Sequence, residues 1–462
     1  MSETDIELRR VAILGGGGRE YEIGRAIAAS SVEDIEISFL PGNGGTDQLP
    51  YSQNVAIDPA DSSKVLKYVM DNDIGLTIIG SENHIVTGTP DLLRQNGLIV
   101  FAPSALAALM EAKKSRGTEF MKKFGVPYPD TLTVYDMNTA SDFIRSHVPG
   151  TYVMKADGLC AGKGVDPFDN DDGLSPAALR EKALQKAYAM HSGELFGEAG
   201  KVFQFQTKEF GDEISVVIFF DGKNYVILPI SQDHKRLGVG DTGDMTGGNG
   251  AYAPVPRSIV NEELERQIID TIVEPTVYGL QEEARLDPNF VYRGAIYAGL
   301  MLTADGPKVI EYNVRPGDPE TEAQLPVMAA AGVDSLELFQ STADGSLDPS
   351  KYPKSYNDLG TCALSVVLSA CGYPKNPQLG AVIHGLDKGY DDVIIQQAGT
   401  RRNENAETVV AGGRAVIATG VANDFDTAAD SAEAAIGEKN NGVYFDGMQS
   451  RPDIGWRVRE QT

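Results

Sequence analysis

Cysteine is scarce in this chain, whose 462 residues contain only Cys160, Cys362 and Cys371. Three thiols so far apart supply neither a disulfide framework nor the ligand spacing of a zinc site. We therefore expect all three to be reduced and buried, as in a cytoplasmic protein.

Long apolar runs are also missing. The longest, such as residues 363–370, are interrupted by serine, glycine or charge, and fall far short of the roughly 20 residues that span a bilayer. Residues 1–10 contain no apolar stretch of the kind found in a signal peptide. We therefore expect a cytoplasmic protein with no membrane partner.

Basic residues are too few to balance the acidic ones: 40 Lys and Arg face 66 Asp and Glu, so the net charge is −26. Because nucleic-acid-binding proteins present a basic face, we expect no nucleic-acid partner. Anionic small molecules remain possible ligands, since a few cations gathered in a cleft dominate the local field. The length predicts three or four domains.

The order of apolar segments predicts a multi-domain α/β fold. A strand at 11–15 runs into four glycines, a helix at 20–29 and a strand at 35–40, which is the opening of a parallel sheet. Further elements are expected as a helix at 64–72, a strand at 76–79, a helix at 91–96 and a strand at 99–102. Residues 1–104 are thus interpreted as a Rossmann-like domain.

Two more units follow. Residues 105–340 open with one predicted helix at 105–124 and contain a long helix at 262–284 and strands at 295–303 and 308–312. Residues 341–462 form a small α/β domain, with strands expected at 362–369, 393–397 and 415–419 and a helix at 426–436.

Two glycine-rich turns are candidate phosphate sites. The run Gly15-Gly16-Gly17-Gly18-Arg19-Glu20 joins a strand to a helix, whose free N–H groups attract anions, although Glu20 stands where a dinucleotide fingerprint needs its third glycine. A tight structural turn is an equally good interpretation there. In the second, Lys155 precedes Gly158, Gly162, Lys163 and Gly164, a loop suited to covering a polyphosphate.

A third segment, residues 311–320, gathers metal and anion ligands. Glu311 and Asn313 are two apart on a predicted strand and therefore share a face. Their oxygen atoms suit Mg²⁺, and Arg315 on the same face suits a phosphoryl or carboxylate group. A fourth segment, residues 232–252, is dense in polar, basic and glycine residues, which indicates a loop built around a ligand.

Taken in order, these segments resemble the phosphoribosylamine–glycine ligase family. The matching motifs are Gly-Gly-Arg-Glu at 17–20, 41–46, Lys-Ala-Asp-Gly-Leu-x-Ala-Gly-Lys-Gly-Val at 155–165, Gln-Asp-His-Lys-Arg at 232–236, Asp-Thr-Gly at 241–243, 297–301, Asn-Val-Arg-x-Gly-Asp-Pro-Glu-Thr at 313–321 and Asp-Ile-Gly-Trp-Arg at 453–457. They cover residues 10 to 459.

The resemblance implies an N-terminal Rossmann-like domain, an ATP-grasp core with a mobile lid at residues 126–196, and a C-terminal domain. It implies that ATP, with Mg²⁺ or Mn²⁺, activates glycine as a glycyl phosphate, which 5-phosphoribosylamine then attacks. The product would be glycinamide ribonucleotide, in purine synthesis. We expect a monomer or weak homodimer.

The resemblance also implies roles for individual residues. The implied catalytic residues are Arg315, Asp318 and Lys235; those that bind the nucleotide are Lys114, Lys155, Gly162, Lys163, Gly164 and Glu209; those that bind glycine or the amine are Gly17, Gly18, Arg19, Asp233, Thr246, Gly247, Gly248 and Gly317; and the metal ligands are Glu311 and Asn313.

The sequence departs from the family pattern at four places. Tyr21 stands where the family has His, Lys208 where it has a second acid, Asn249 where it has Met and Pro316 where it has Phe. These changes leave open a paralogous ligase acting on another amine or acid. A non-catalytic binding module is disfavoured, because the cationic and metal-ligating residues are retained.

Overall fold

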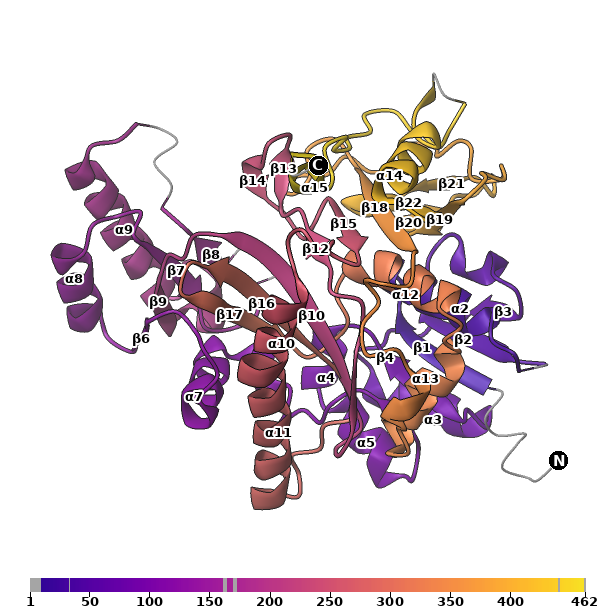
Figure 1. Cartoon of the computed structure of the whole chain (residues 1–462), viewed down its shortest axis with the longest axis horizontal. Coiled ribbons are helices and arrows are strands. Elements are labelled where there is room, and N and C mark those ends of the chain that lie inside the picture. Colours follow the sequence, from indigo (N-terminus) through magenta and orange to yellow (C-terminus); the bar gives the residue numbers. More distant parts are fainter. Residues whose placement is uncertain (1–9, 33, 161–163, 169–172, 439–440, 461–462) are drawn as a thin grey trace.

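The computed structural model describes residues 10–32, 34–160, 164–168, 173–438 and 441–460 (Figure 1). Its N-terminal sheet has the order β3-β2-β1-β4-β5, with all neighbouring strands parallel. The strands are β1 (Arg10–Gly15), β2 (Glu36–Pro41), β3 (Ser52–Asn54), β4 (Leu76–Ile79) and β5 (Val100–Phe101). The chain order reverses beside β1, and ligand sites of open parallel sheets form at such points, beyond the carboxyl ends of the strands.

Apolar residues explain the burial of this sheet. Residues 11–14 of β1 and all four residues of β4 are buried, as expected for parallel strands covered on both faces. The accompanying helices are α2 (Gly18–Ala28), η1 (Thr46–Gln48), α3 (Ser62–Asp71), α4 (Glu82–Val86) and α5 (Thr89–Gln95). The predicted parallel domain is confirmed, and the predicted strand 76–79 coincides with β4.

The single helix predicted at 105–124 is wrong. The segment forms α6 (Leu109–Ala112) and α7 (Lys114–Phe124), separated at Lys113, whose backbone is extended. The cause is a contact distant in sequence. The N–H of Lys114 donates to the carbonyl of Asp157 at 2.9 Å and the N–H of Ser115 donates to Oδ1 of Asp157 at 2.7 Å. The first N–H groups of α7 are thereby satisfied by Asp157, the residue that follows β7.

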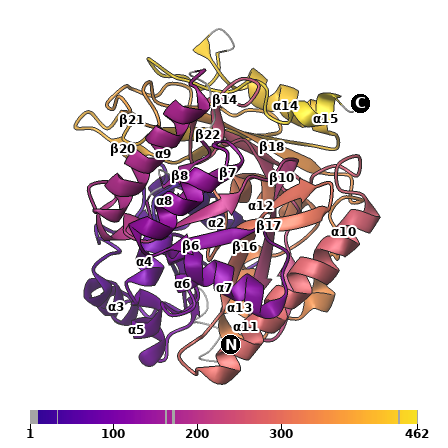
Figure 2. The same ribbon diagram turned by 90° about the vertical axis from the view of Figure 1, so that its left-hand side faces the viewer.

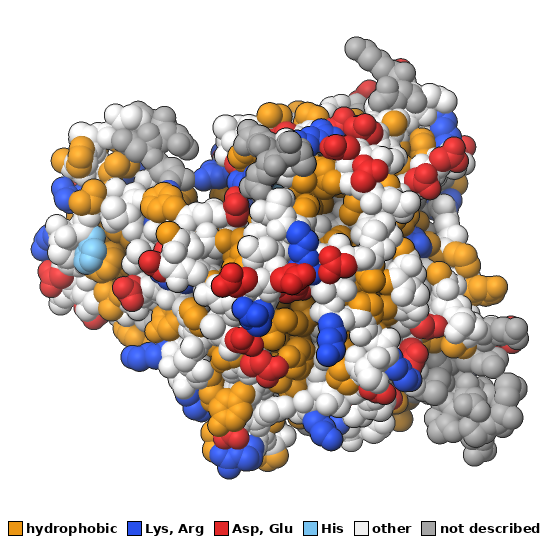
Figure 3. Space-filling model, in the orientation of Figure 1, with side chains coloured by type: hydrophobic (Ala, Val, Ile, Leu, Met, Phe, Trp, Pro, Cys, Tyr) orange, Lys and Arg blue, Asp and Glu red, His pale blue; other side chains and the backbone are white. Residues whose placement is uncertain are grey.

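Two four-stranded sheets form the middle of the molecule. One, in the order β6-β9-β7-β8, carries two helices and projects as a lobe at the left of Figure 1. Its elements are β6 (Thr131–Val134), α8 (Met137–Ser146), β7 (Tyr152–Ala156), β8 (Val165–Asp166), α9 (Pro176–His191), η2 (Gly197–Gly200) and β9 (Phe203–Thr207). Figure 2 shows α8 and α9 on the outside of this lobe, and Figure 3 shows the notch that separates the lobe from the rest.

The second sheet, β11-β10-β16-β17, faces the lobe and is antiparallel throughout. Its strands are β10 (Asp212–Phe220), β11 (Tyr225–Ile227), β16 (Gly294–Thr303) and β17 (Gly306–Asn313). The predicted long helix at 262–284 is present as α10 (Glu262–Ile268), a π-turn η3 (Ile269–Val273) and α11 (Glu274–Leu286). It is followed, after β17, by α12 (Glu320–Ala330), α13 (Ser335–Asp344) and η4 (Pro349–Lys351).

The last sheet crosses the sequence units. Its order is β12-β15-β18-β22-β19, so two short strands from the middle of the chain extend the C-terminal sheet. The elements are β12 (Gln232–Asp233), β15 (Gly250–Ala253), β18 (Cys362–Ser369), β19 (Val393–Gln397) and β22 (Arg414–Ala422), with α14 (Phe425–Ala434), α15 (Trp456–Glu460) and the hairpins β13 (Arg236–Gly238)–β14 (Thr242–Met245) and β20 (Thr400–Arg402)–β21 (Thr408–Val410). The segment that carries Asp233 is thus held by the C-terminal domain.

Two expectations about exposure have different outcomes. All three cysteines are free thiols, but each is partly exposed, so the prediction that they are buried is wrong. Within the described residues, no helix is both long enough and apolar enough to cross a membrane.

A C-terminal clip, defined as residues 451–457, holds the β13–β14 hairpin. The guanidinium of Arg451, only 1% exposed, pairs with Asp241 at 2.8 Å and with Asp453 at 2.6 Å. Arg457 pairs with the other oxygen of Asp241 at 2.7 Å, and the N–H of Gly240 donates to Asp453. The hairpin follows directly after Asp233, so the clip fixes the position of that segment.

We expect Arg451→Met to lower the free energy of unfolding by about 3 kcal/mol, because loss of one member of a buried ion pair leaves uncompensated charge. Urea and thermal unfolding measure this effect. Arg459→Met is the matched control: Arg459 lies near the same end of the chain, and its guanidinium pairs with the exposed Asp426 and Asp430. Equal stability of the two variants would show that the clip contributes nothing.

Candidate functional site

The glycine-rich turn after β1 is closed by Glu20, the residue that breaks the dinucleotide fingerprint. Oε2 of Glu20 accepts a hydrogen bond from the N–H of Gly17 at 2.8 Å, which caps α2. Oε1 of Glu20 binds the guanidinium of Arg19, whose Nη1 donates to the carbonyl of Pro316 at 3.1 Å. The turn is therefore fastened to the end of β17.

Gly18 is required by close packing. A Cβ atom there would lie 2.5 Å from Cδ1 of Ile417 and 2.6 Å from Oε1 of Glu322. The first comes from the C-terminal sheet and the second from α12. Parts of all three sequence units therefore meet at the N-terminus of α2, and Figure 1 shows α2 and α12 side by side there.

Lys155 occupies a buried position on β7. Its Nζ donates to the carbonyl of Ile310 on β17 at 3.0 Å, so the lysine bridges the projecting lobe to the core sheet. Burial lowers the pKa of Lys155 to about 8, with Glu311 opposing the shift and Lys114 adding to it. The structure thus brings Lys114, Lys155 and Glu311 into one electrostatic neighbourhood.

Glu311 and Asn313 lie on the same face of β17, as predicted. Nδ2 of Asn313 faces Oε1 of Glu311 at 3.4 Å. Burial acts to raise the pKa of Glu311, but Lys235, Lys155 and Lys114 outweigh it, and the pKa lies below its ordinary value. An ionised carboxylate beside an amide oxygen is a donor set that fits Mg²⁺ or Mn²⁺.

A metal ion at this position would take few ligands from the protein. Among the residues that the structure describes, no three His, Cys, Asp or Glu side chains gather in a way that could hold a metal. Mg²⁺ bound by one or two carboxylates completes its shell with phosphate oxygens and water. The site therefore fits a metal that arrives with a nucleotide.

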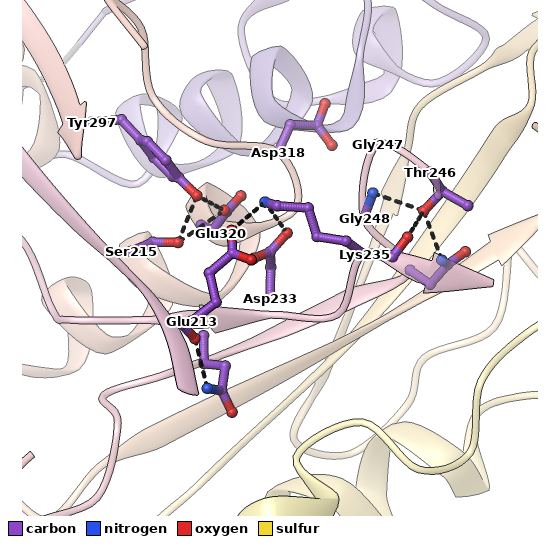
Figure 4. Close-up of polar contacts among 12 residues, drawn as sticks. Glu213, Ser215, Asp233, Lys235, Thr246, Gly247, Gly248, Tyr297, Asp318 and Glu320 are labelled. Carbon is purple, nitrogen blue, oxygen red and sulfur yellow. Dashed lines mark hydrogen bonds and ion pairs between the residues drawn. The ribbon is translucent and has the colours of Figure 1, made fainter. Parts of the chain in front are cut away.

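Lys235 is surrounded by carboxylates (Figure 4). Its Nζ lies 2.6 Å from Oδ2 of Asp233 and 3.7 Å from Oε1 of Glu213. Burial acts to lower the pKa of Lys235, but Asp233, Tyr297 and Glu213 raise it well above its ordinary value. Next to them, the hydroxyl of Tyr297 donates to Oε1 of Glu320 at 3.0 Å. The ammonium group thus stays charged although it is partly buried.

One oxygen in this cluster has no partner. Oδ1 of Asp233 is buried and accepts no hydrogen bond from any described residue. A buried acceptor left open costs free energy unless a ligand satisfies it. The loop that follows is ordered by Thr246, whose Oγ1 donates to the carbonyl of Lys235 at 2.8 Å and accepts from the N–H of Gly248 at 3.1 Å. Asp233 and this loop border the same space.

Arg315 has carboxylate partners that the sequence analysis missed. Its Nε lies 2.8 Å from Oε2 of Glu82, and its Nη2 lies 3.3 Å from Oε1 of Glu111. Burial raises the pKa of Glu111 to about 7, although Arg315 acts to lower it. Glu82 directly follows the carboxyl end of β4, so the rule for parallel sheets gave a signal for it; Glu111, Glu213 and Glu320 carried no such signal.

Asp318 lies between two parts of the chain that are far apart in sequence. Its Oδ1 is 3.0 Å from Nη1 of Arg414, at the start of β22. A Cβ atom on Gly17 would lie 3.4 Å from its other oxygen, Oδ2. Asp318 therefore lies between the C-terminal sheet and the turn after β1. Arg414, its partner, is a further residue that the sequence analysis missed.

The remaining predicted residues are less central or fall outside the described residues. Gly162 and Lys163 lie outside them, and Gly164 follows at their edge, where its carbonyl accepts from Ala156 at 2.7 Å. Glu209 is paired with Lys308 at 2.7 Å, away from the Lys235 cluster. The carbonyl of Gly317 accepts from Thr321 at 2.6 Å, at the start of α12.

The departures from the family pattern have structural explanations. Tyr21 packs against an apolar cluster. Asn249 donates through Nδ2 to the carbonyl of Arg236 at 3.0 Å and to Thr246 at 2.8 Å. Pro316 contributes its backbone carbonyl, which binds Arg19. The backbone N–H of Lys208 donates to the carbonyl of Thr151 at 2.9 Å, at the base of the projecting lobe.

Three family models match consecutive parts of the chain. They are the N domain of phosphoribosylglycinamide synthetase at residues 9–111, its ATP-grasp domain at 112–321 and its C domain at 363–457. Curated relatives include phosphoribosylamine–glycine ligases from Yersinia pestis, 37% identical over 450 residues, and from Salmonella typhi, 35% identical over 454 residues. These alignments cover 97% and 98% of this chain, and 98% and 99% of the relatives.

Solved structures show the same similarity. The crystal structure of phosphoribosylamine–glycine ligase from Thermotoga maritima matches with a TM-score of 0.76 and 30% identity, covering 96% of this chain and all of that one. A biotin carboxylase domain from Hydrogenobacter thermophilus, in a complex with MgADP, matches with a TM-score of 0.69 over 96% of this chain and 91% of that one. At 13% identity, that second likeness shows the fold alone.

Glu322 is a buried carboxyl group with no hydrogen-bond partner. Its side chain is 0% exposed, and neither oxygen is bonded to any described residue. Burial and then Asp318 raise its pKa well above the ordinary value, against the smaller effects of Arg414 and Arg19. The folded protein therefore keeps a proton on Glu322 that the unfolded chain releases.

We expect Glu322→Gln to stabilise the protein at alkaline pH and not at acid pH. Because the folded-state pKa is raised, the folded state binds more protons, and stability falls as pH rises above the ordinary value of 4.5. Glutamine has the shape of the neutral acid but does not ionise, so the variant does not lose stability in this way as pH rises. Unfolding temperatures should coincide at pH 4 and favour the variant at pH 8; a difference independent of pH would contradict the assignment.

Proposed function

Because this chain belongs to the phosphoribosylglycinamide synthetase family, we propose that the site described above joins the carboxylate of glycine to the amine of 5-phosphoribosylamine. The chain is an ATP-dependent carboxylate–amine ligase of purine biosynthesis, and its products are glycinamide ribonucleotide, ADP and phosphate. The observation that supports the location best is the group of three lysines around Glu311: Lys114, Lys155 and Lys235 come from three segments, and together they hold the pKa of this carboxylate below its ordinary value.

The chemistry of the reaction explains this arrangement. A carboxylate is a poor electrophile, so glycine first takes the γ-phosphoryl group of ATP and becomes glycyl phosphate. The amine then attacks the carbonyl carbon, an amide bond forms and phosphate leaves. Charge moves between oxygens in both steps, so fixed cations in a site that excludes water stabilise the transition states.

In this proposal, the lysines of the projecting lobe and of α7 bind ATP. Lys155 and Lys114 bind the phosphates, with Gly162, Lys163 and Gly164 supplied by the loop that covers them, and Glu209 lies toward the base of the nucleotide. Residues 126–196, which make up most of this lobe, act as a lid. Its closure excludes water from glycyl phosphate, which would otherwise hydrolyse.

Glu311 and Asn313 would hold the divalent ion. ATP is the nucleotide, and a neighbour of the same fold is described in complex with MgADP; we propose Mg²⁺ or Mn²⁺ for this chain. When bound, the ion neutralises charge on the phosphate oxygens. Asn313 also faces Nη2 of Arg315 at 3.5 Å, so the metal ligands and the phosphoryl-binding arginine share one support.

Five residues act on the reacting groups. Lys235 and Arg315 stabilise the negative oxygens, and the carboxylates around them keep both cations in place before substrates bind. Asp318, with Gly317, receives the ammonium group of glycine. Asp233 offers its open oxygen to the amine substrate.

The amine substrate lies between the turn after β1 and the loop after Lys235. Gly17, Gly18 and Arg19 border it on one side, and the loop residues Thr246, Gly247 and Gly248 border it on the other. A paralogous ligase acting on another amine is not favoured, because Tyr21 packs in an apolar cluster and Asn249 braces its own loop.

The proposal also covers the domain boundaries, the cellular location, the oligomeric state and the partners. We place the domain divisions after residues 104 and 340. We propose a cytoplasmic monomer or weak homodimer that acts on small molecules and has neither a nucleic-acid nor a membrane partner.

The proposed reaction can be tested directly. Purified protein with ATP, Mg²⁺, glycine and freshly prepared 5-phosphoribosylamine should release ADP and form glycinamide ribonucleotide in equal amounts. Omitting either glycine or the amine should reduce product formation to zero. ADP release that needs neither co-substrate, or another amino acid used better than glycine, would contradict the proposal. Product is measured by mass spectrometry and ADP by a coupled assay.

The proposed metal ligand can be tested by substitution. Glu311→Gln should lower kcat by about 100-fold or more, because a preorganised charge at a phosphoryl-transfer site typically contributes that much. The variant should also need a higher Mg²⁺ concentration for half-maximal rate. Glu282→Gln, which removes an exposed carboxylate paired with Arg285, serves as control and should match the wild type. Unchanged turnover in Glu311→Gln would place the metal elsewhere.

A further inference from the structure

Arg414 is a cation from the C-terminal domain that reaches the amine side of the site. Its Nη1 donates to the carbonyl of Gly247 at 2.8 Å and to the carbonyl of Asp318 at 2.7 Å. The same nitrogen lies 3.0 Å from the carboxylate of Asp318. These three contacts fix the guanidinium against the substrate loop, and they use one of its nitrogens only.

The other two nitrogens of Arg414 are unused. Nε and Nη2 make no hydrogen bond to any residue in the described part of the chain, and the side chain is 22% exposed. An arginine whose position is fixed by one nitrogen can present the remaining N–H groups as a fork. Such a fork matches two oxygens of a phosphate.

Tyr373 places a hydroxyl beside this fork. Its oxygen accepts from the N–H of Gly247 at 3.0 Å, which leaves its proton free to donate. A Cβ atom built on Gly247 would lie 3.4 Å from this oxygen and 3.4 Å from Cζ of Arg414. Both donors therefore border one glycine, which has no side chain of its own.

The other cations near the amine side are already committed. All three nitrogens of the Arg19 guanidinium are bound to Glu20 or to the carbonyl of Pro316. Lys235 is held by Asp233 and Glu213. A phosphate dianion requires positive charge that acidic side chains have not consumed, and Arg414 is the cation here that pairs with one carboxylate and keeps two nitrogens available.

The charge distribution also decides which end of the site takes an anion. Figure 4 shows Glu213 and Glu320 gathered near the ammonium end of Lys235, whereas Gly247 and Gly248 lie near its backbone. A phosphate near the carboxylates would be repelled. The end that carries Gly247 has Arg414 and Tyr373, and its one carboxylate, Asp318, is already paired with Nη1 of Arg414. A substrate with a phosphate at one end and an amine at the other therefore has one favourable orientation.

Backbone contacts join this end to the N-terminal domain. The N–H of Gly399 donates to the carbonyl of Arg414 at 2.8 Å, and the adjoining Thr400 accepts from the N–H of Gly44 at 3.1 Å. The side chain of Asn43 donates both to the carbonyl of Gln397 and to that of Gly16. The turn after β1 and the start of β22 are thus held in one frame.

We propose that Arg414 and the hydroxyl of Tyr373 bind the 5-phosphate of the amine substrate. This inference rests on the proposed function and adds the C-terminal domain to the substrate site. Arg414 binds two phosphate oxygens, Tyr373 donates to a third, and the amine points toward Asp233 and the glycyl phosphate. The phosphate therefore acts as an anchor that takes no part in bond formation.

The experiment compares two amines that differ only in the phosphate. 5-Phosphoribosylamine is prepared from ribose 5-phosphate and ammonia, and ribosylamine from ribose and ammonia. Arg414→Gln should lower kcat/KM for phosphoribosylamine by about 100-fold, the worth of two charge-assisted hydrogen bonds. The KM for ATP, and kcat/KM for ribosylamine, should stay within about twofold of the wild type, since ATP and ribosylamine do not touch the fork.

Two further variants separate charge from geometry. Arg414→Lys keeps the charge but loses the fork, so it should lower kcat/KM for phosphoribosylamine by an intermediate amount. Tyr373→Phe removes one donor and should lower kcat/KM for phosphoribosylamine by about 10-fold. Lys375→Gln is the matched control: this exposed cation, two residues from Tyr373, pairs with Asp244 at 2.8 Å and should leave every constant unchanged.

Binding without turnover gives a second readout. Calorimetric titration with ribose 5-phosphate, free of ATP, should show affinity about 100-fold weaker in Arg414→Gln and unchanged in Lys375→Gln. Equal losses for both amines would show that Arg414 only supports Gly247 and Asp318, and would overturn the inference, as would unchanged binding of ribose 5-phosphate. A wild type that makes no glycinamide ribonucleotide would instead overturn the proposed function.

Discussion

The site depends on one constraint: cations that will meet phosphate must be stable while no phosphate is bound. A lysine or arginine moved out of water without a partner would lose its charge or destabilise the fold. Here Lys235 is held by Asp233 and Glu213, and Arg315 by Glu82 and Glu111. The acidic side chains thus keep the basic ones charged in a place where a charge acts most strongly.

This constraint also joins the domains. Glu82 comes from the N-terminal domain and pairs with Arg315, which follows the core sheet; Arg414 comes from the C-terminal sheet and pairs with Asp318. Each pair connects units that the sequence separates. The site therefore exists only when the units are assembled, and the same contacts that hold them together aim the cations at the substrates.

The sequence predicted what is local and periodic. The strands at 76–79, 362–369 and 393–397 coincide with β4, β18 and β19, because each is a short apolar run between turn signals. The face shared by Glu311 and Asn313 follows from the two-residue period of a strand.

What failed depends on contacts distant in sequence. The helix expected at 105–124 is broken because Asp157 captures the N–H groups at the start of α7, and no local pattern signals such a partner. β12 and β15 join the C-terminal sheet for a similar reason. Glu111 was missed because its partner, Arg315, is more than 200 residues away. Glu82 is as distant from Arg315, but its place after the carboxyl end of β4 did give a signal. Pairing at that separation follows from the assembled fold.

The positions where the sequence departs from its family show how such a site tolerates change. Pro316 serves through its carbonyl, which binds Arg19, and any residue in that backbone conformation supplies the same acceptor. Asn249 replaces an apolar side chain, and its amide finds partners in Arg236 and Thr246 of its own loop. In both cases the substrate meets a surface set by backbone geometry. These two departures therefore leave the charged side chains and the glycines of the site in place.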